Sequence, residues 1–464
     1  FANPYPVSDG AADGTNRDVS ADSRMDELML WIPYLESLHI SAIYIGPLFE
    51  SSTHGYDTKD YKKVDRRLGD NEDFKEFVRL AHENGIRVVV DGVFNHTGRE
   101  FFAFQDIQKN REHSPYCSWY KGVNFGWNSP YNDGFGYEAW RNCFELVNLN
   151  LYEQAVRDYL FDVIHFWITE FDIDGIRLDC ADCLTFDFMK EMRYRTGQWK
   201  EDFWLMGEVI HGDYARWVND EMLHSTTNYE LHKGLYSGHN DHNYFEIAHT
   251  IRRQFDDNGG IYRGRTLYSF VDNHDVDRLM SKLNNKDHIR EVYTLLYTLP
   301  GIPSIYYGSE WGIEGRKQGA SDDAMRPQLD LEKMQKENPH PELTAHIAAL
   351  GKMRKENPVL ADGKYRELVL TNRQYAYARI KDQDAIVVAA NNDENPADMS
   401  IPVPVDGTYE NAFTKEAVPV VDAAVCKLIR LSGWMHVKVK YSEKNDASSK
   451  GSVWHFVILI SIYG

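Results

Sequence analysis

Short, fully apolar segments alternate with helices that carry one apolar face, and this alternation limits the fold more than any other feature. Segments such as Arg87–Val93 and Ile302–Gly308 have the length and composition of strands that are buried on both faces. Repeated units of this kind predict an α/β fold, a (β/α)8 TIM barrel rather than an open sheet. Further strands are expected at Ile40–Phe49, Gly175–Asp179, Phe203–Glu208, Thr227–Glu230 and Thr266–Asp275, with a first strand near Phe1–Val7.

Two stretches interrupt the alternation and indicate further domains. Residues 97–150 are long, aromatic and irregular, and they separate a strand from its helix, so we expect a small protruding subdomain after the third strand. After Pro358 the pattern changes to short alternating strands, which are typical of an antiparallel β-sandwich. The predicted domains are the barrel at 1–96 and 151–357, the subdomain at 97–150 and the C-terminal β-sandwich at 358–464.

The charge of the chain excludes two classes of partner. The formal net charge is −20, which repels nucleic-acid phosphates and anionic membrane surfaces but not a neutral substrate. The chain has 5 cysteines, an odd and low number that argues against a disulfide framework. Cys180 and Cys183 form a CxxC pair that we interpret as reduced, buried packing residues. A zinc site or a redox role is the weaker alternative for this pair.

The ends of the chain give an expectation about location. No apolar run is long enough to span a bilayer and no signal peptide opens the sequence, so a cytoplasmic location is expected. A secreted protein stays open as an alternative, because Phe1 is not a native start. The segment Val453–Gly464 has the length of a buried strand. The oligomeric state is not predicted.

Polar residues recur at the ends of the expected strands. Any one of these carboxylates could cap a helix. Three carboxylates, an arginine and two histidines from four strands instead predict an active site, because parallel barrel strands all end at one rim. His96 and His274 are expected to donate to sugar hydroxyls. The full set is Asp91–His96, Arg177, Asp179, Glu208 and Asp272–Asp275.

Two carboxyl groups at such a rim can cleave a glycosidic bond, one as nucleophile and one as general acid. Arg177 and Asp179 are two residues apart on a strand and point to the same side. The guanidinium favours the ionised form of Asp179, as a nucleophile requires. Glu208 ends an apolar strand, where burial and a neighbouring carboxylate such as Asp275 favour the protonated form of an acid.

Six short motifs follow one another along the chain. They are HGYDT at His54–Thr58, DGVFNHTG at Asp91–Gly98, ELVNLN at Glu145–Asn150, GIRLDCAD at Gly175–Asp182, GEVI at Gly207–Ile210 and FVDNHD at Phe270–Asp275. With this ordered set, which is much more specific than any one motif, the chain resembles the alpha-amylase family of glycoside hydrolases from about Ile40 to Arg326.

The resemblance implies a role for each residue at a matching position. Asp179 would be the nucleophile, Glu208 the acid/base and Asp275 the third carboxylate, which grips the distorted sugar. The same sugar ring would contact Tyr56, His96, Arg177 and His274, and the next ring would contact Asp322 and Arg326. Asp182–Cys183 stand where many alpha-amylases have Lys-His, which is more similar to the neopullulanase and cyclomaltodextrinase side of the family.

The expected function is retaining cleavage of α-1,4-glucosidic bonds in starch, maltooligosaccharides or related α-glucans. A neopullulanase or cyclomaltodextrinase, or a glucanotransferase, would use the same residues. A non-catalytic glucan-binding relative is a remote alternative, because such relatives usually lose a carboxylate and all three are present here. The substrate is the only partner expected.

The chemistry requires no cofactor, but a structural calcium ion is a candidate. Asp9, Asp13, Asn16 and Asp18 place hard oxygen ligands at a spacing that suits calcium. A solvated acidic loop would explain the same residues equally well. Asn95 resembles a calcium ligand of the family.

Overall fold

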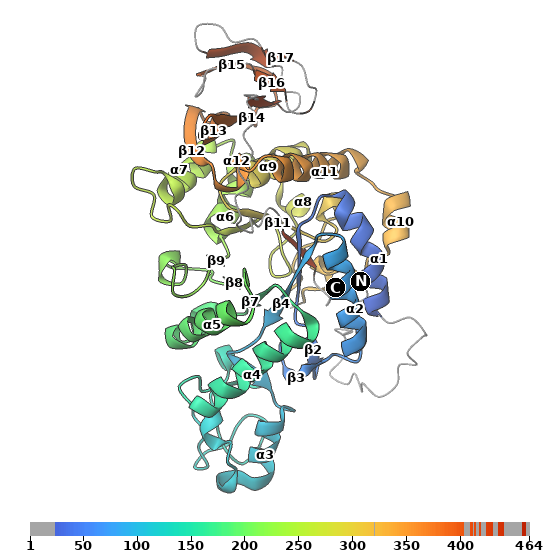
Figure 1. Cartoon of the computed structure of the whole chain (residues 1–464), viewed down its shortest axis with the longest axis vertical. Helices are drawn as coiled ribbons and strands as arrows, with labels where there is room; N and C mark the ends of the chain where they lie inside the picture. The colour runs from blue at the N-terminus through green and yellow to red at the C-terminus, as the bar shows by residue number, and fades with distance from the viewer. Residues whose placement is uncertain are drawn as a thin grey trace.

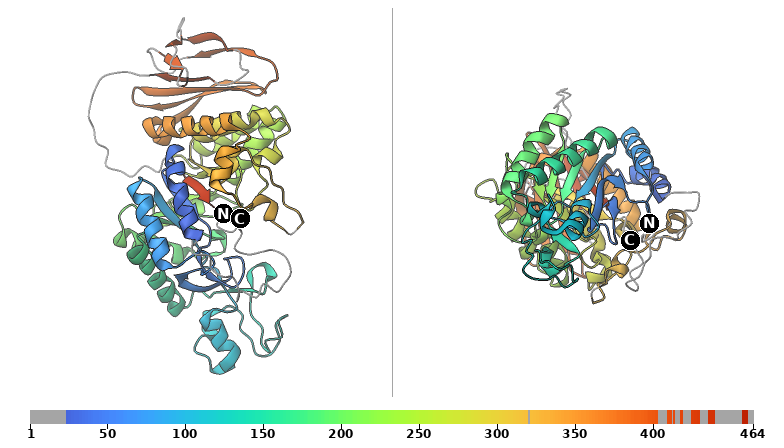
Figure 2. Two further views of the ribbon diagram at one scale, coloured as in Figure 1. Left: turned by 90° about the vertical axis from the view of Figure 1, so that its right-hand side faces the viewer. Right: turned by 90° about the horizontal axis from the view of Figure 1, so that it is seen from below.

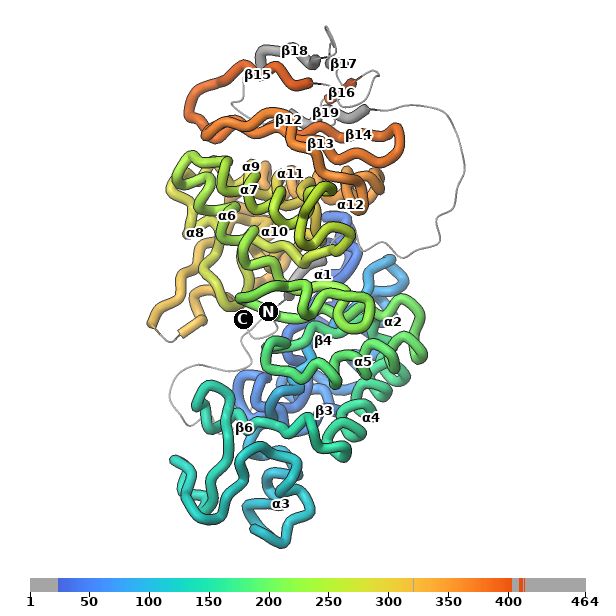
Figure 3. Tube along the Cα trace, turned by 90° about the vertical axis from the view of Figure 1, so that its left-hand side faces the viewer, coloured from blue at the N-terminus to red at the C-terminus, as the bar shows by residue number. Residues whose placement is uncertain are grey.

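The computed structural model describes residues 24–319, 321–402, 409–411, 413, 417–418, 424–429, 435–439 and 457–460. The first strand expected near Phe1–Val7 and the four candidate calcium ligands lie outside these residues. Figures 1 and 3 show a β domain at one end of the molecule, a barrel in the middle and the segment around α3 at the other end.

Eight parallel strands form the barrel, in the order β10-β11-β20-β1-β4-β7-β8-β9. A parallel bridge between Thr227 and Tyr268 joins the two edge strands and closes the sheet. The predicted (β/α)8 fold class is therefore confirmed. The strands are β1 (Ala42–Ile45), β4 (Arg87–Gly92), β7 (Gly175–Leu178), β8 (Trp204–Gly207), β9 (Ser225–Thr226), β10 (Tyr268–Phe270), β11 (Ile302–Tyr306) and β20 (Val457–Ile460).

Strand β20 comes from the far end of the sequence. It pairs in parallel with β1 on one side and with β11 on the other. The sequence predicts a buried strand within Val453–Gly464 but assigns it to the β-sandwich at 358–464, and for Val457–Ile460 that assignment is wrong. A barrel needs a strand between β11 and β1 to leave no open edge, and this apolar segment occupies that position.

Helices cover the outside of the barrel, as the view along the molecule shows (Figure 2, right). In α2 the buried face consists of Phe74, Phe77, Val78 and Ala81, and Asp70 caps the first turn by accepting from the amides of Glu72 and Asp73. The helices are α1 (Arg24–Ser37), α2 (Asn71–Glu83), α4 (Gln154–Phe171), α5 (Phe186–Trp199), α6 (Tyr229–Asn240), α7 (Tyr244–Phe255), α8 (Leu279–Lys282), α9 (Ile289–Thr298), α10 (Leu331–Lys336), α11 (Pro341–Glu356) and α12 (Val359–Asp362).

The prediction of a strand at Thr227–Glu230 is wrong, because these residues form the connection between a strand and a helix and the first turn of that helix. The barrel strand β9 ends at Thr226, and α6 begins at Tyr229. Asn228 explains the difference, because its side chain accepts from the amide of Leu231 and caps the helix.

Residues 97–150 contain α3 (Phe102–Asn110) and a short antiparallel pair, β5 (His96–Gly98) with β6 (Leu146–Asn148). They follow the C-terminal end of β4, so they lie on the side of the barrel where the strands end. Aromatic rings pack within this segment, for example Phe104 against Tyr137. Trp119 and Tyr137 are buried, whereas Trp127 and Tyr131 are exposed.

The C-terminal region is antiparallel, as predicted. One sheet has the order β12-β13-β14-β19-β16-β17, and β15 pairs with β18 in a second sheet. The strands are β12 (Lys364–Leu370), β13 (Gln374–Lys381), β14 (Asp384–Asn391), β15 (Ala397–Pro402), β16 (Tyr409–Asn411), β17 (Ala417–Val418), β18 (Ala424–Ile429) and β19 (Met435–Val439).

The β domain lies against the barrel helices (Figure 2, left). Two buried arginines link backbone segments in this region, Arg379 between the β domain and the barrel and Arg354 within the barrel. Arg379 of β13 donates to the carbonyl of Thr298 at the end of α9, at 2.9 Å, and to the carbonyl of Gly363. Arg354 of α11 donates to the carbonyls of Tyr297 and Gly301. Each guanidinium supplies the hydrogen bonds that these buried carbonyls would otherwise lack once they are removed from water.

A further antiparallel pair, β2 (Phe49–Ser51) with β3 (Thr58–Val64), lies beyond the end of β1 and carries the loop that contains Tyr56.

None of the helices that the structure describes is both long enough and apolar enough to cross a bilayer.

Candidate active site

The C-terminal ends of the barrel strands bring the predicted catalytic residues together. Arg177 lies in β7 with Asp179 directly after it, and Glu208 directly follows β8. The parallel register places Arg177 beside Asp91 of β4. The topology therefore delivers three carboxyl groups to one end of the barrel, where active sites of this fold form.

The guanidinium of Arg177 is the centre of this group. Its Nη1 donates to Asp91 Oδ1 at 3.0 Å and to Asp179 Oδ1 at 2.9 Å, and its Nη2 lies 2.7 Å from Glu208 Oε2. Arg177 is 3% exposed and Asp179 is 8% exposed. One buried cation therefore fixes Asp179 and Glu208 relative to each other.

Burial raises the pKa of both predicted catalytic carboxyl groups, because each loses hydration. The sequence predicts that Arg177 favours ionised Asp179. The guanidinium does lower the pKa of Asp179, but desolvation has the larger effect and the net direction is upward. The charges of Asp179 and Asp275 raise the pKa of Glu208 further. Protonated Glu208 is the form that a general acid requires.

The pH dependence of kcat/KM should show this shift. Glu208 must be protonated to donate, so activity falls as the pH rises through its raised pKa. We expect the alkaline limb of the kcat/KM profile on maltooligosaccharides to lie above 4.5, the ordinary pKa of a glutamate. With an α-glucosyl fluoride, whose leaving group needs no proton, this limb should weaken. A limb at or below the ordinary glutamate value would contradict the environment described for Glu208.

Tyr56 and the two predicted histidines lie around the carboxylates. Tyr56 Oη lies 2.9 Å from His274 Nε2 and 3.4 Å from Asp91 Oδ2. Burial lowers the pKa of His96 to about 3 and that of His274 well below its usual range, so both rings are neutral. A neutral imidazole offers a hydroxyl one donor and one acceptor. His96 Nε2 is buried without a hydrogen-bond partner, so it is available to a ligand.

Asp275 lies further out than the other two carboxylates, with 40% of its side chain exposed. Its Oδ2 is 3.1 Å from His274 Nε2, and its Oδ1 is 3.4 Å from Arg326 Nη2. The same nitrogen of Arg326 lies 3.1 Å from Asp322 Oδ2. The predicted pair Asp322 and Arg326 is therefore connected to the catalytic group through Asp275.

Helix capping, the alternative explanation for strand-end carboxylates, holds for Asp272. Its Oδ2 accepts from the amide of Leu279 at 2.8 Å and from the Ser309 hydroxyl at 2.9 Å. Asp179 and Glu208 instead face a shared cation, so their positions are not explained by helix ends.

Two further residues complete the group: Asp91, which the sequence analysis includes among the strand-end polar residues without a role of its own, and Tyr44, which it does not include. Asp91 is fully buried, and burial raises its pKa to about 7 against the opposing effect of Arg177. Tyr44 of β1 donates to Asp91 Oδ2 at 2.8 Å. The register of β4 against β7 would have identified Asp91, because it places the residue directly opposite Arg177.

The structure leaves the calcium prediction untested, since Asp9, Asp13, Asn16 and Asp18 lie outside the described residues. Asn95, the remaining candidate, is 3% exposed. Its Nδ2 donates to His96 Nδ1 at 3.2 Å and lies 3.3 Å from Asn148 Oδ1. In this arrangement Asn95 orients His96.

Comparison with known protein families identifies the family to which this chain belongs. The sequence profile described as "Alpha amylase, catalytic domain" matches residues 25–345, which include every described residue of the site. The chain belongs to the alpha-amylase family. The family's "Alpha amylase, C-terminal all-beta domain" matches residues 369–424, which agrees with the antiparallel sheets. The predicted family is thereby confirmed.

This alpha-amylase family member is similar to relatives on the cyclomaltodextrinase and neopullulanase side of the family. It is 31% identical to a cyclomaltodextrinase of Bacillus sp. over 78% of the chain and 64% of that protein. It is 29% identical to the maltogenic alpha-amylase of Bacillus acidopullulyticus over 83% of the chain and 65% of that protein. The chain thus spans somewhat less than two thirds of the length of these curated relatives.

A solved structure shows the same fold. The structure of a cyclomaltodextrinase superimposes with a TM-score of 0.81 at 27% identity, covering 89% of this chain and 70% of that one. This likeness supports the side of the family that Asp182–Cys183 predict.

Proposed function

We propose that this chain is a retaining glycoside hydrolase that cleaves α-glucosidic bonds, with the substrate range of a cyclomaltodextrinase or neopullulanase. The observation that carries the proposal is the single buried guanidinium of Arg177, which holds Asp179 and Glu208 side by side. Such a pair of carboxyl groups supplies a nucleophile and an acid to one glycosidic bond.

The contacts suit a two-step reaction. Asp179 attacks the anomeric carbon and forms a covalent ester while Glu208 gives its proton to the departing glycosidic oxygen. Arg177 occupies Asp179 Oδ1, and Oδ2 accepts from the Cys180 thiol at 3.3 Å, a weak donor that leaves this oxygen nucleophilic. In the second step Glu208 takes a proton from water, which attacks the same carbon and releases Asp179.

The relatives and the motif residues Asp182–Cys183 support cyclomaltodextrins, pullulan and short maltooligosaccharides over long starch chains as substrates. Digestion of these substrates, with cellulose and sucrose as controls, would test the range. We expect cyclomaltodextrin to be cleaved faster than starch. Cleavage of cellulose or sucrose alone would contradict the proposal, and transfer products in place of free sugars would indicate a glucanotransferase.

The anomeric form of the first product is a second test. A double displacement through Asp179 returns the sugar to its original configuration, so the product should be the α-anomer before mutarotation. Proton nuclear magnetic resonance during the first minutes of hydrolysis measures this form. An initial β-anomer would mean that water attacks directly and that Asp179 is not a nucleophile.

We also propose that any calcium bound by Asp9, Asp13, Asn16 and Asp18 is structural, because two carboxyl groups suffice for the reaction. Chelation should lower the Tm and leave kcat unchanged at temperatures where the protein stays folded. Identical melting curves with and without chelator would show that no structural calcium is bound.

An intracellular location is our proposal as well, and the four described cysteines, all free, agree with a reducing compartment.

A further inference from the structure

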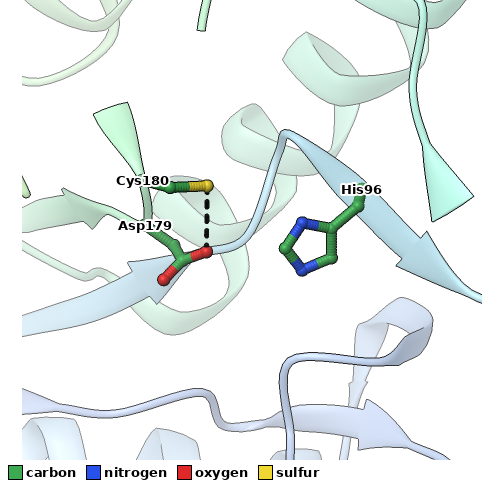
Figure 4. A group of neighbouring side chains, drawn as sticks. All are labelled: His96, Asp179 and Cys180. Carbon is green, nitrogen blue, oxygen red and sulfur yellow. Dashed lines mark hydrogen bonds between the residues drawn. The ribbon is translucent and has the colours of Figure 1, made fainter. Parts of the chain in front are cut away.

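Three donor groups of different chemistry meet beside the nucleophile. One ring nitrogen of His96, a carboxylate oxygen of Asp179 and the sulfur of Cys180 all lie within 4.8 Å of one another, and all three residues are buried. Figure 4 shows the His96 ring facing the Asp179 carboxylate from β5, with the Cys180 thiol directed at the same carboxylate. The three residues come from two chain segments that the barrel topology brings together.

The backbone holds Cys180 in this position. It has a left-handed conformation, with φ 35° and ψ 55°, at the end of β7. Its amide donates to Glu208 Oε2 at 3.1 Å, which anchors the turn. The turn places the Cys180 side chain next to Asp179, and the thiol donates to Asp179 Oδ2 at 3.3 Å.

His96 supplies an independent indication of a ligand. The residue is 1% exposed, and its Nε2 has no hydrogen-bond partner. A buried polar atom without a partner is costly unless a ligand or water completes it. Nε2 binds a metal in the tautomer that carries the proton on Nδ1, so the side-chain amide of Asn95 must turn to present its oxygen to Nδ1 when the metal binds.

We propose that His96, Asp179 and Cys180 form a binding site for a thiophilic divalent cation, Zn²⁺ or Cd²⁺, and that occupancy of this site switches off glycoside hydrolysis. A thiolate, an imidazole and a carboxylate are the ligands that zinc takes, whereas calcium and magnesium prefer oxygen alone. Three protein ligands leave a fourth position for water.

The separations are within reach of tetrahedral coordination. Zinc–ligand bonds of about 2.0–2.3 Å place tetrahedral ligands roughly 3.3–3.8 Å apart. Donor atoms that lie within 4.8 Å need to move inward by about 1 Å or less. The thiol proton is released to solvent as the metal–sulfur bond forms, so the cation is balanced by one thiolate and one carboxylate.

The consequence for activity rests on the proposed function. The metal occupies Asp179, which would otherwise attack the sugar, and His96, which would otherwise contact it. Metal and glucan therefore compete for the same atoms, and inhibition should be competitive with substrate. Physiologically, hydrolysis would respond to the free concentration of a thiophilic metal.

The first experiment measures binding without reference to turnover. The full-length protein, freed of metal, is titrated with Cd²⁺ and the ultraviolet thiolate-to-cadmium charge-transfer band is followed. We expect one equivalent to bind, with release of one proton. Cys180→Ala should remove the band, and His96→Gln should weaken binding at least about 100-fold, since loss of a direct ligand costs more than loss of its support.

Controls separate this site from other thiols. Cys117→Ala removes a cysteine of the protruding subdomain and should leave the titration unchanged. Cys183→Ala tests the neighbouring thiol of the CxxC pair, which is exposed and not buried as the sequence predicted, whereas Cys180 is buried. Binding that requires Cys183 and is indifferent to His96 would overturn the proposal, as would a band that persists in Cys180→Ala.

The second experiment measures inhibition of nitrophenyl α-maltoside hydrolysis by Zn²⁺, with each variant compared with its own rate in the absence of metal. We expect the inhibition constant to rise at least about 100-fold in Cys180→Ala and not in Cys117→Ala. Equal inhibition of the two variants would overturn the proposal. Cadmium binding by a protein that hydrolyses no glucan would sustain the metal site and refute the proposed function instead.

Discussion

Asp179→Asn is expected to abolish cleavage of every glucan and of α-glucosyl fluoride. The amide cannot form the ester with the anomeric carbon, and a better leaving group does not remove that requirement. Loss of a covalent nucleophile lowers kcat by at least about 10⁴-fold in other enzymes. The fold should persist, because Arg177 keeps its contacts with Asp91 and Glu208 and the amide oxygen can still accept from Nη1.

The matched control is Asp187→Asn, which makes the same chemical change at an exposed carboxylate in the first turn of α5, outside the motif residues. It should retain activity within a few-fold of the unaltered protein. Circular dichroism and thermal unfolding check that both variants fold. Retained fluoride activity in folded Asp179→Asn would show that the nucleophile is another residue.

Glu208→Gln should lower kcat/KM on maltooligosaccharides by about 10²- to 10⁴-fold, the contribution of a positioned proton donor. The same variant should still react with α-glucosyl fluoride in the first step, because fluoride leaves without a proton. The two variants therefore differ in how they respond to the leaving group, and this difference distinguishes nucleophile from acid.

Glu201→Gln, at an exposed glutamate before β8, is the matched control for this change and should behave as the unaltered protein. Added azide should raise the turnover of Glu208→Gln, since an anionic nucleophile needs no base in the second step. Equal losses on fluoride and on maltooligosaccharides would mean that Glu208 does not act as the acid.

The periodicity of the sequence predicted the barrel because its strands are buried on both faces. A continuous apolar run such as Arg87–Val93 fits few other positions in a soluble protein. The same rule misplaced Val457–Ile460, because an apolar run shows that a strand is buried but not which sheet contains it. The error at Thr227–Glu230 was local, since the cap formed by Asn228 competes with strand extension.

The candidate site was predictable in part, because residues at the ends of parallel strands must converge. Arg177, Asp179 and Glu208 follow from this rule and from their chemistry. The role of Asp91 depends on the register between β4 and β7, which periodicity does not specify. The position of Cys180 depends on a left-handed turn, and a cysteine gives little sequence signal for that conformation.

The most direct test of the proposed mechanism is mass spectrometry of Glu208→Gln after brief reaction with α-glucosyl fluoride. Without the base, the second step should be slower than the first, so the covalent intermediate should accumulate. We expect a mass increase of one glucosyl unit, located by peptide mapping on Asp179 and absent in a variant that also carries Asp179→Asn. An adduct on a different residue, or release of β-glucose with no adduct, would contradict this mechanism.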